Sequence, residues 1–392
     1  MSSQLNTPTH SWQFFSPTKI IIRQGAAQAV ASEMKALGGR RAMIITDPGI
    51  VRAGLLNDIR KSLRAAQLSV DIFDQVELEP PARVIDQAGA YARKKSIDTI
   101  IGLGGGSSLD TAKGASIMAT NSGKVMEYAG MELVPKRGLP KIMIPTTGSG
   151  SEVTRVFAPT DEETQTKAVV YTNFNLAEVV ISDPLLASTM PSELTAETGI
   201  DALIAAIESF VSVNANPFSD LLALEAIRLI SSNLPTVSAK SGHVTARQYI
   251  SLAAIQANLA WQSAGLGAVH ALTYVLESEC NISHARACSI MLPHVMSYNM
   301  TGNLNKFGLI AEAMGEKIDC LSEYDAAKKS IGAVKQLLET VNISYRLSEY
   351  GVSSEQLPAL VEGAMKQARL FVPNPRDLRE TDVKKIYQSA ME

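Results

Sequence analysis

Short apolar runs alternate with amphipathic segments along the chain up to about residue 185. The apolar runs are rich in β-branched residues and predict six strands, at 19–22, 42–46, 70–73, 99–102, 141–145 and 179–182. Segments of helical periodicity lie between several of them, for example at 55–67 and 84–95. This alternation predicts βαβ units and a mostly parallel, Rossmann-like sheet.

The pattern changes after Asp183 and Pro184, where the strand signals fade. Long periodic segments rich in Ala and Leu then predict helices at 193–211, 219–232, 246–261, 266–279, 326–341 and 357–368. We therefore predict an α/β domain over residues 1–187 and an all-α domain over residues 188–392.

The amino-acid composition argues against several classes of protein. Among the 392 residues, 36 Lys and Arg stand against 39 Asp and Glu, so there is no basic excess and we predict no nucleic-acid partner. No apolar run reaches the roughly 18 to 20 residues that a membrane helix needs, and the polar N-terminus lacks the apolar segment of a secretory signal. The odd number of cysteines, three, argues against a disulfide framework and predicts a reducing, cytoplasmic location.

A glycine cluster, Gly104-Gly105-Gly106-Ser107, follows the fourth predicted strand and precedes a helical start. Such a turn lets the backbone approach a diphosphate, whose charge the N–H groups of the next helix stabilise. A second loop of small and hydroxyl residues, at 145–154, also follows an apolar strand. Two such loops favour one phosphate-bearing ligand across the sheet edge, although either loop also fits an ordinary strand-to-helix turn.

Asp47 closes the second predicted strand. A carboxylate there would accept hydrogen bonds from a ribose diol and repel a 2′-phosphate, which favours NAD over NADP. An aspartate that forms a turn before Pro48 and Gly49 explains the same position equally well.

The helical half contains an arrangement typical of a metal site. Asp201 lies inside an apolar helical segment, where a lone charge is costly. His270 and Tyr274 share one helix face, and His284 follows. One carboxylate and two imidazoles would form part of a site for Fe²⁺ or Zn²⁺, while a histidine in a protein core remains the alternative for each imidazole. We set aside His10, His243 and His294, which lie in a polar tail, a predicted loop and a position after Pro293.

Several motifs in order resemble the iron-containing (group III) alcohol dehydrogenase family, over nearly the whole chain. They are Gly104-Gly105-Gly106-Ser107 with Asp110 and Lys113, Pro145-Thr146-Thr147, Ser151-Glu152-Val153-Thr154, Asp183-Pro184, Thr198-Gly199-Ile200-Asp201-Ala202-Leu203 and Leu292-Pro293-His294-Val295. The resemblance implies a dehydroquinate-synthase-like α/β domain followed by a helical domain. It also implies a homodimer, and hydride transfer between an alcohol and a nicotinamide, with a metal that polarises the substrate oxygen.

The resemblance assigns roles to residues by position. Cofactor contacts fall on Asp47, Gly104, Gly105, Gly106, Ser107, Asp110, Thr146, Thr147, Ser151, Val153 and Lys167. Metal ligands fall on Asp201, His270 and His284, which match three of the family's four ligands.

The chain departs from the family at the reaction centre. The family's second ligand, a histidine, is replaced by Ala205, and a second histidine often given a proton-relay role is replaced by Tyr274. A phenol is a poorer relay at neutral pH than an imidazole unless the site lowers its pKa. Arg286 would clamp an anionic substrate or lie as a solvated surface arginine. Cys280 would add a ligand only if the segment before His284 were helical, and free cysteines are usually inert.

Three explanations of the lost histidine stay open. A metal is held by Asp201, His270 and His284 with an added water, or the enzyme works without metal in the manner of maleylacetate reductases, with His270, Tyr274, His284 or Arg286 as catalytic groups. Alternatively, the chain binds a nucleotide without redox chemistry. We predict an NAD-dependent oxidoreductase that interconverts a small primary alcohol and its aldehyde, with or without an anionic tail on the substrate.

Overall fold

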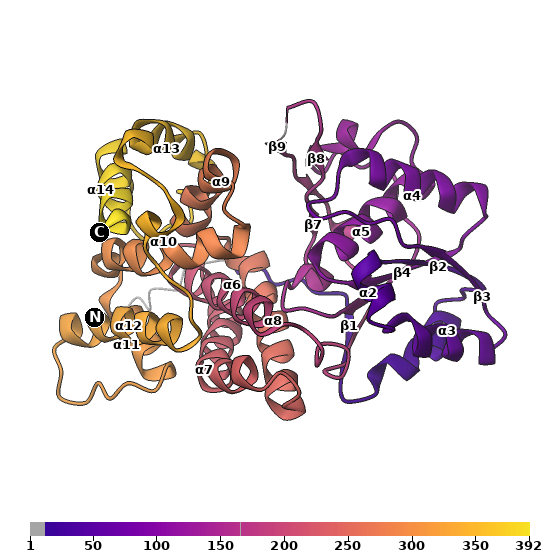
Figure 1. Cartoon of the computed structure of the whole chain (residues 1–392), viewed down its shortest axis with the longest axis horizontal. Helices are drawn as coiled ribbons and strands as arrows, with labels where there is room; N and C mark the ends of the chain where they lie inside the picture. Colours follow the sequence, from indigo (N-terminus) through magenta and orange to yellow (C-terminus); the bar gives the residue numbers. More distant parts are fainter. Residues whose placement is uncertain (1–11, 165) are drawn as a thin grey trace, which may run out of the picture.

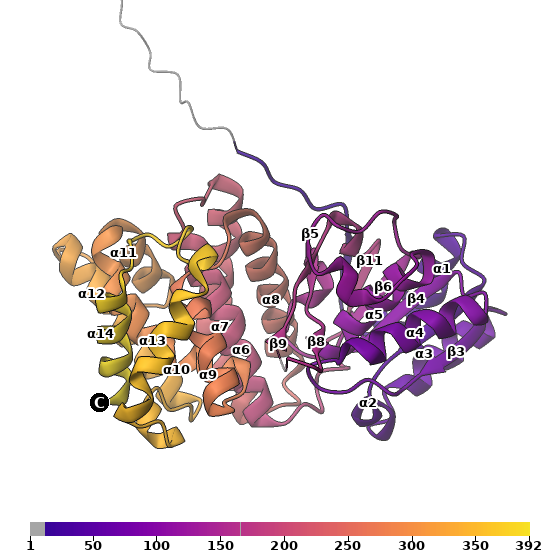
Figure 2. The same cartoon turned by 90° about the horizontal axis from the view of Figure 1, so that it is seen from above.

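The computed structural model describes residues 12–164 and 166–392, so the polar N-terminal segment and His10 lie outside the described residues. Figure 1 shows two lobes side by side, an α/β lobe from the first half of the chain and a helical lobe from the second. The view from above in Figure 2 shows the same division, with helix α8 (Val244–Ala264) on the side of the helical lobe that faces the α/β lobe.

The α/β lobe is built on a six-stranded parallel sheet in the order β1-β11-β6-β4-β2-β3. Its strands are β1 (Lys19–Ile22), β2 (Arg41–Ile45), β3 (Ser69–Phe73), β4 (Thr99–Gly104), β6 (Lys141–Pro145) and β11 (Val179–Ser182). The six predicted strands and the parallel sheet are therefore confirmed. Short strands form two small additional sheets: β5 (Gly130–Met131), β7 (Val156–Phe157), β8 (Thr160–Asp161), β9 (Thr166–Lys167) and β10 (Val170–Tyr171).

Helices cover both faces of this sheet. They are α1 (Val30–Ala36), α2 (Pro48–Arg52), α3 (Leu56–Ala65), α4 (Ala82–Lys94) and α5 (Gly106–Thr120). Ala42 and Ile44 of β2 pack with α1 and α3, whereas Met43 and Ile45 pack with α4 and α5. Because alternate side chains of a strand point to opposite faces, the almost continuous apolar run of β2 fills both layers.

The helical lobe contains α6 (Ser192–Val211), α7 (Pro217–Ala239), α8, α9 (Ala268–Cys280), α10 (His284–Asn299), α11 (Leu304–Ala313), α12 (Glu323–Thr340), α13 (Leu357–Met365) and α14 (Glu380–Met391). Their apolar faces share one buried core. The six predicted helices are confirmed, with shifted ends, but α10, α11 and α14 were not predicted. Helix α10 contains Pro293, and a proline normally ends a helical pattern.

The predicted division after residue 187 falls between β11, the last strand of the main sheet, and α6. Among the described residues, no helix is both long and apolar enough to span a bilayer.

Candidate active site and metal centre

Two loops of the α/β lobe follow neighbouring strands of the sheet. β4 ends at Gly104, and Gly105 caps α5, so the first N–H groups of this helix have no intrahelical acceptor. Gly104 has a φ of 144°, and a Cβ there would lie 2.6 Å from the hydroxyl oxygen of Ser108. The turn therefore requires glycine, and the start of α5 can receive an anionic group.

A cleft of about 860 Å³ lies between these loops and the helical lobe. Six of the predicted cofactor residues line it: Asp47, Gly105, Gly106, Ser107, Thr146 and Thr147. Leu194 and Thr198 line it from α6, and Thr198 lies three residues before Asp201. The cleft therefore extends from the glycine loop to the helix that carries the predicted metal ligand.

Asp47 is the N-cap of α2. Its Oδ1 atom accepts hydrogen bonds from the N–H groups of Gly49, at 2.8 Å, and Ile50, at 3.1 Å. The Ser108 hydroxyl donates to its Oδ2 atom at 3.1 Å. The turn-forming role is therefore present, and Asp47 also lines the cleft.

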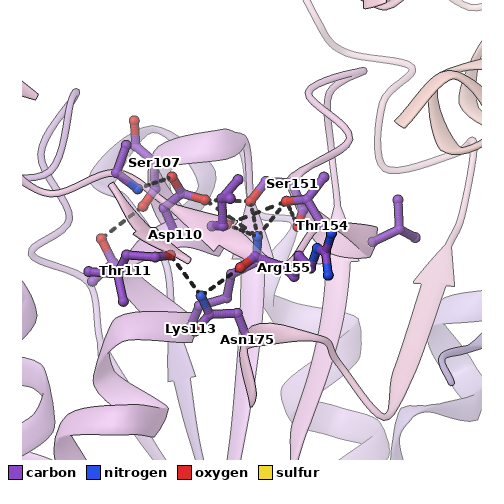
Figure 3. Close-up of polar contacts among 12 residues, drawn as sticks. Ser107, Asp110, Thr111, Lys113, Ser151, Thr154, Arg155 and Asn175 are labelled. Atoms are coloured by element: carbon purple, nitrogen blue, oxygen red, sulfur yellow. Dashed lines mark hydrogen bonds and ion pairs between the residues drawn. The ribbon is translucent and has the colours of Figure 1, made fainter. Parts of the chain in front are cut away.

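A buried polar network lies behind the two loops (Figure 3). The Lys113 ammonium group donates to the hydroxyls of Ser151, at 2.8 Å, and Thr154, at 2.9 Å. Ser151 also hydrogen-bonds to Asp110, whose other oxygen accepts from the N–H of Ala158 at 3.0 Å. Burial lowers the pKa of Lys113 to about 8, against the opposing effect of Asp110. This network ties α5 to the second loop.

Several predicted cofactor residues do not line the cleft: Gly104, Asp110, Ser151, Val153 and Lys167. Asp110 and Ser151 belong to the buried network, and Val153 is fully buried in the apolar core. Lys167 forms ion pairs with Glu79, at 3.0 Å, and with Glu277 of α9, at 2.7 Å. The polar atoms of Asp110, Ser151 and Lys167 are satisfied by other residues, so in this structure these side chains support the second loop or join the two lobes.

The predicted metal residues come together in the helical lobe. Asp201 of α6, His270 of α9, and His284 and Cys288 of α10 form one group whose ligand atoms all lie within 4.8 Å of one another. Helix α10 packs against both α6 and α9, which brings residues more than 80 positions apart into contact. The sequence analysis missed Cys288, because it lies one turn after His284 only if a helix begins there.

A carboxylate orients each histidine of the group. Nδ1 of His270 hydrogen-bonds to Glu208 at 2.5 Å, and Nδ1 of His284 hydrogen-bonds to Glu277. With each Nδ1 engaged in this way, each Nε2 is left for a ligand, as is usual for histidines that hold metals. Neither Glu208 nor Glu277 was predicted from the sequence as a site residue. Glu208 lies two helical turns after Asp201, and Glu277 lies two turns after His270, so this spacing was the available signal.

The residues present fit a divalent metal. Oδ1 of Asp201 is buried and has no hydrogen-bond partner among the described residues, which is costly for a carboxylate without a cation. Burial lowers the pKa of His284, but Cys288, Glu277 and Asp201 outweigh that effect and hold this pKa well above its ordinary value. A metal cation would compensate the same negative environment, and its binding must displace the proton.

Tyr274 and Arg286, two of the predicted catalytic residues, lie close to this group in sequence. The ring of Tyr274 lies 6.0 Å from that of His284, and burial raises the pKa of Tyr274, the direction opposite to that needed for a proton relay. Arg286 is paired with Glu197 and, at 2.7 Å, with Glu193. Arg286 is therefore not a solvated surface arginine. Because its guanidinium already forms ion pairs with these two carboxylates, it is not free to bind an anionic substrate.

The two other described histidines have structural roles. His243 caps α8 by accepting the N–H of Ala246 at 3.2 Å. His294 hydrogen-bonds to Ser389 at 3.1 Å and to the carbonyl oxygen of Tyr345 at 2.9 Å. Both histidines therefore make hydrogen bonds within the helical lobe, outside the metal group.

Comparison with known families matches both halves of the chain. The family described as "Iron-containing alcohol dehydrogenase" matches residues 17–184, and "Fe-containing alcohol dehydrogenase family, C-terminal" matches residues 195–391. The chain belongs to the iron-containing alcohol dehydrogenase family. The resemblance based on motifs is therefore confirmed, and the protein is an alcohol dehydrogenase of the iron-containing type.

Relatives of this alcohol dehydrogenase match over almost the full length. Long-chain-alcohol dehydrogenase 1 of Geobacillus thermodenitrificans (strain NG80-2) is 39% identical over 370 residues, 93% of each chain. The NAD-dependent methanol dehydrogenase of Bacillus methanolicus is 32% identical over 379 residues, 96% of this chain and 99% of the relative. A crystal structure of 1,3-propanediol oxidoreductase superposes with a TM-score of 0.94 at 37% identity, covering 97% of this chain and 100% of that one.

Proposed function

We propose that this alcohol dehydrogenase interconverts a small primary alcohol and its aldehyde with NAD(H) and a divalent metal, Fe²⁺ or Zn²⁺. The observation that carries the proposal is the convergence of Asp201, His270 and His284 on one small volume, beside the helix that lines the cleft. The names of the relatives, which include an NAD-dependent methanol dehydrogenase, support the choice of substrate class and cofactor.

Each part of the cleft has a role in this proposal. The free N–H groups at the start of α5 bind the diphosphate of NAD. Asp47 accepts hydrogen bonds from the ribose diol and disfavours a 2′-phosphate, which supports NAD over NADP. NAD supplies a nicotinamide ring that accepts or donates the hydride.

The helical lobe carries the residues that would position the reacting oxygen. Asp201, His270 and His284 would hold the metal, which would supply Lewis-acid polarisation of the substrate oxygen. Glu208 and Glu277 keep the two imidazoles in the orientation that leaves Nε2 free. Arg286 is neutralised by two glutamates, so no anionic substrate tail is part of the proposal. A homodimer and a cytoplasmic location stay predictions.

The test is NADH oxidation by the purified protein with a panel of short aldehydes, and NAD⁺ reduction with the matching alcohols. We expect turnover, loss of activity after chelation, and recovery with Fe²⁺ or Zn²⁺. His284→Ala should remove activity, whereas His243→Asn, which keeps a capping side chain on α8, should retain it. Absence of turnover with every substrate, with or without added metal, would refute the proposal.

A further inference from the structure

We propose that the thiolate of Cys288 is the fourth protein ligand of the metal, and that it makes the site prefer Zn²⁺ to Fe²⁺. The thiolate would take the place of the imidazole that the chain lacks at Ala205. This inference rests on the proposed metal dependence, but it concerns a residue and a metal preference that the proposed function does not require.

The position of Cys288 is the first argument. Cys288 lies one helical turn after His284 on α10 and is fully buried. Its Sγ atom lies 3.7 Å from Nε2 of His284, and Oδ1 of Asp201 lies 3.9 Å from the same nitrogen. Because Glu277 holds Nδ1 of that ring, the sulfur and the carboxylate oxygen both lie on its ligand side.

The size of the group is the second argument. A tetrahedral zinc ion, with bonds of about 2.3 Å to sulfur and about 2.1 Å to nitrogen and oxygen, needs roughly 3.6 Å between sulfur and nitrogen. The same geometry needs roughly 3.4 Å between nitrogen and oxygen. The observed 3.7 Å and 3.9 Å lie close to these spacings, and no two ligand atoms of the group are more than 4.8 Å apart. Side-chain movements of about 1 Å would therefore bring all four ligands to bonding distance.

The chemistry of the donor set is the third argument. Two imidazoles and one carboxylate with open positions are typical of Fe²⁺, whereas thiolate is a typical ligand of zinc. Zinc can expand from four to five ligands, which leaves a position for the substrate oxygen beside four protein ligands. Two anionic ligands, Asp201 and Cys288, also balance the two positive charges of the metal, which lowers the cost of burying it. Ala205, one turn after Asp201 on α6, is 7% exposed and has no donor atom. The sulfur therefore restores the number of protein ligands to four.

A spectroscopic experiment tests the ligand directly. The purified full-length protein is freed of metal and loaded with Co²⁺, which gives an intense near-ultraviolet charge-transfer absorption only when a thiolate binds it. We expect this absorption in the wild type, its loss in Cys288→Ser and its retention in Cys280→Ser. Cys280 is a matched control, since it ends α9 and its sulfur lies against Gln356, outside the metal group.

Metal affinity gives the second readout. In Cys288→Ser we expect the Zn²⁺ affinity to fall by about 100-fold, because loss of an atom bound to the metal should cost at least as much as the 10- to 100-fold loss seen when a partner of a ligand is removed. The Fe²⁺ affinity should fall by only about tenfold or less. An unchanged ratio of Zn²⁺ to Fe²⁺ affinity would overturn the metal preference.

The wild-type spectrum decides the question even if Cys288→Ser does not fold. Bound Co²⁺ without the charge-transfer absorption would overturn the thiolate ligand and leave the proposed metal dependence intact. A protein that binds NADH but no divalent metal would instead overturn the proposed metal centre. The two failures are therefore distinguishable.

Discussion

The interaction of Glu208 with His270 leads to a quantitative prediction. The Glu208 side chain is 4% exposed, and its two oxygens accept hydrogen bonds from the Val269 N–H, at 2.6 Å, and from Nδ1 of His270, at 2.5 Å. In Glu208→Gln one of these oxygens becomes an NH₂ group that faces a donor. The variant satisfies both partners only if the imidazole proton moves from Nδ1 to Nε2, the atom that would bind the metal.

The expected magnitude follows from these contacts. Loss of an outer carboxylate partner typically weakens metal binding by about 10- to 100-fold, or about 1.4 to 2.7 kcal/mol. Loss of one charge-assisted hydrogen bond should also lower the free energy of unfolding by about 1.5 to 3 kcal/mol.

The assay is competition for Zn²⁺ against a chromophoric chelator, with urea unfolding in parallel. Glu225→Gln is a suitable control, because Glu225 lies on α7 and pairs with the exposed Arg228 outside the metal group. A folded Glu208→Gln protein whose Zn²⁺ dissociation constant equals that of the wild type would refute the orienting role.

Three further predictions concern the α/β lobe. Gly104→Ala should lower the free energy of unfolding by about 1–3 kcal/mol and weaken NADH binding in a fluorescence titration, because its φ is 144° and the new Cβ would crowd Ser108. Gly242→Ala, with no atom within 4 Å of the new Cβ, should change neither, and equal effects would contradict the steric argument. Asp47→Asn keeps a side chain that caps α2 but removes the charge, so kcat/KM should shift towards NADP; an unchanged ratio would count against the ribose role. Burial raises the pKa of the Glu152 carboxyl from 4.5 to about 7. The neutral carboxyl therefore makes its full contribution to the stability of the folded protein below pH 4.5, and this contribution is lost as the pH rises through 7. Glu152→Gln should therefore gain stability relative to the wild type between pH 5 and 8, by up to about 3 kcal/mol in urea unfolding, and a difference that does not vary with pH would exclude this linkage.

Local sequence patterns determined most of the secondary structure. The central strands β2, β4, β6 and β11 were predictable because they are buried on both faces and therefore read as short apolar runs. The long helices were predictable from periodicity, but α10 was not, since Pro293 interrupts the pattern. Missing α10 concealed the relation between His284 and Cys288, which depends on a helix that begins at His284.

The residue types in the sequence indicated the chemistry of the metal centre, whereas the packing of the helices determined which residues belong to it. Asp201, His270 and His284 could be named from residue type and resemblance, because both depend on local strings of residues. The inclusion of Cys288 and the pairing of Arg286 with Glu197 depend on how α10 packs against α6. Local periodicity determines which face of a helix is apolar, but only the packing of helices distant in sequence determines which polar groups meet between them.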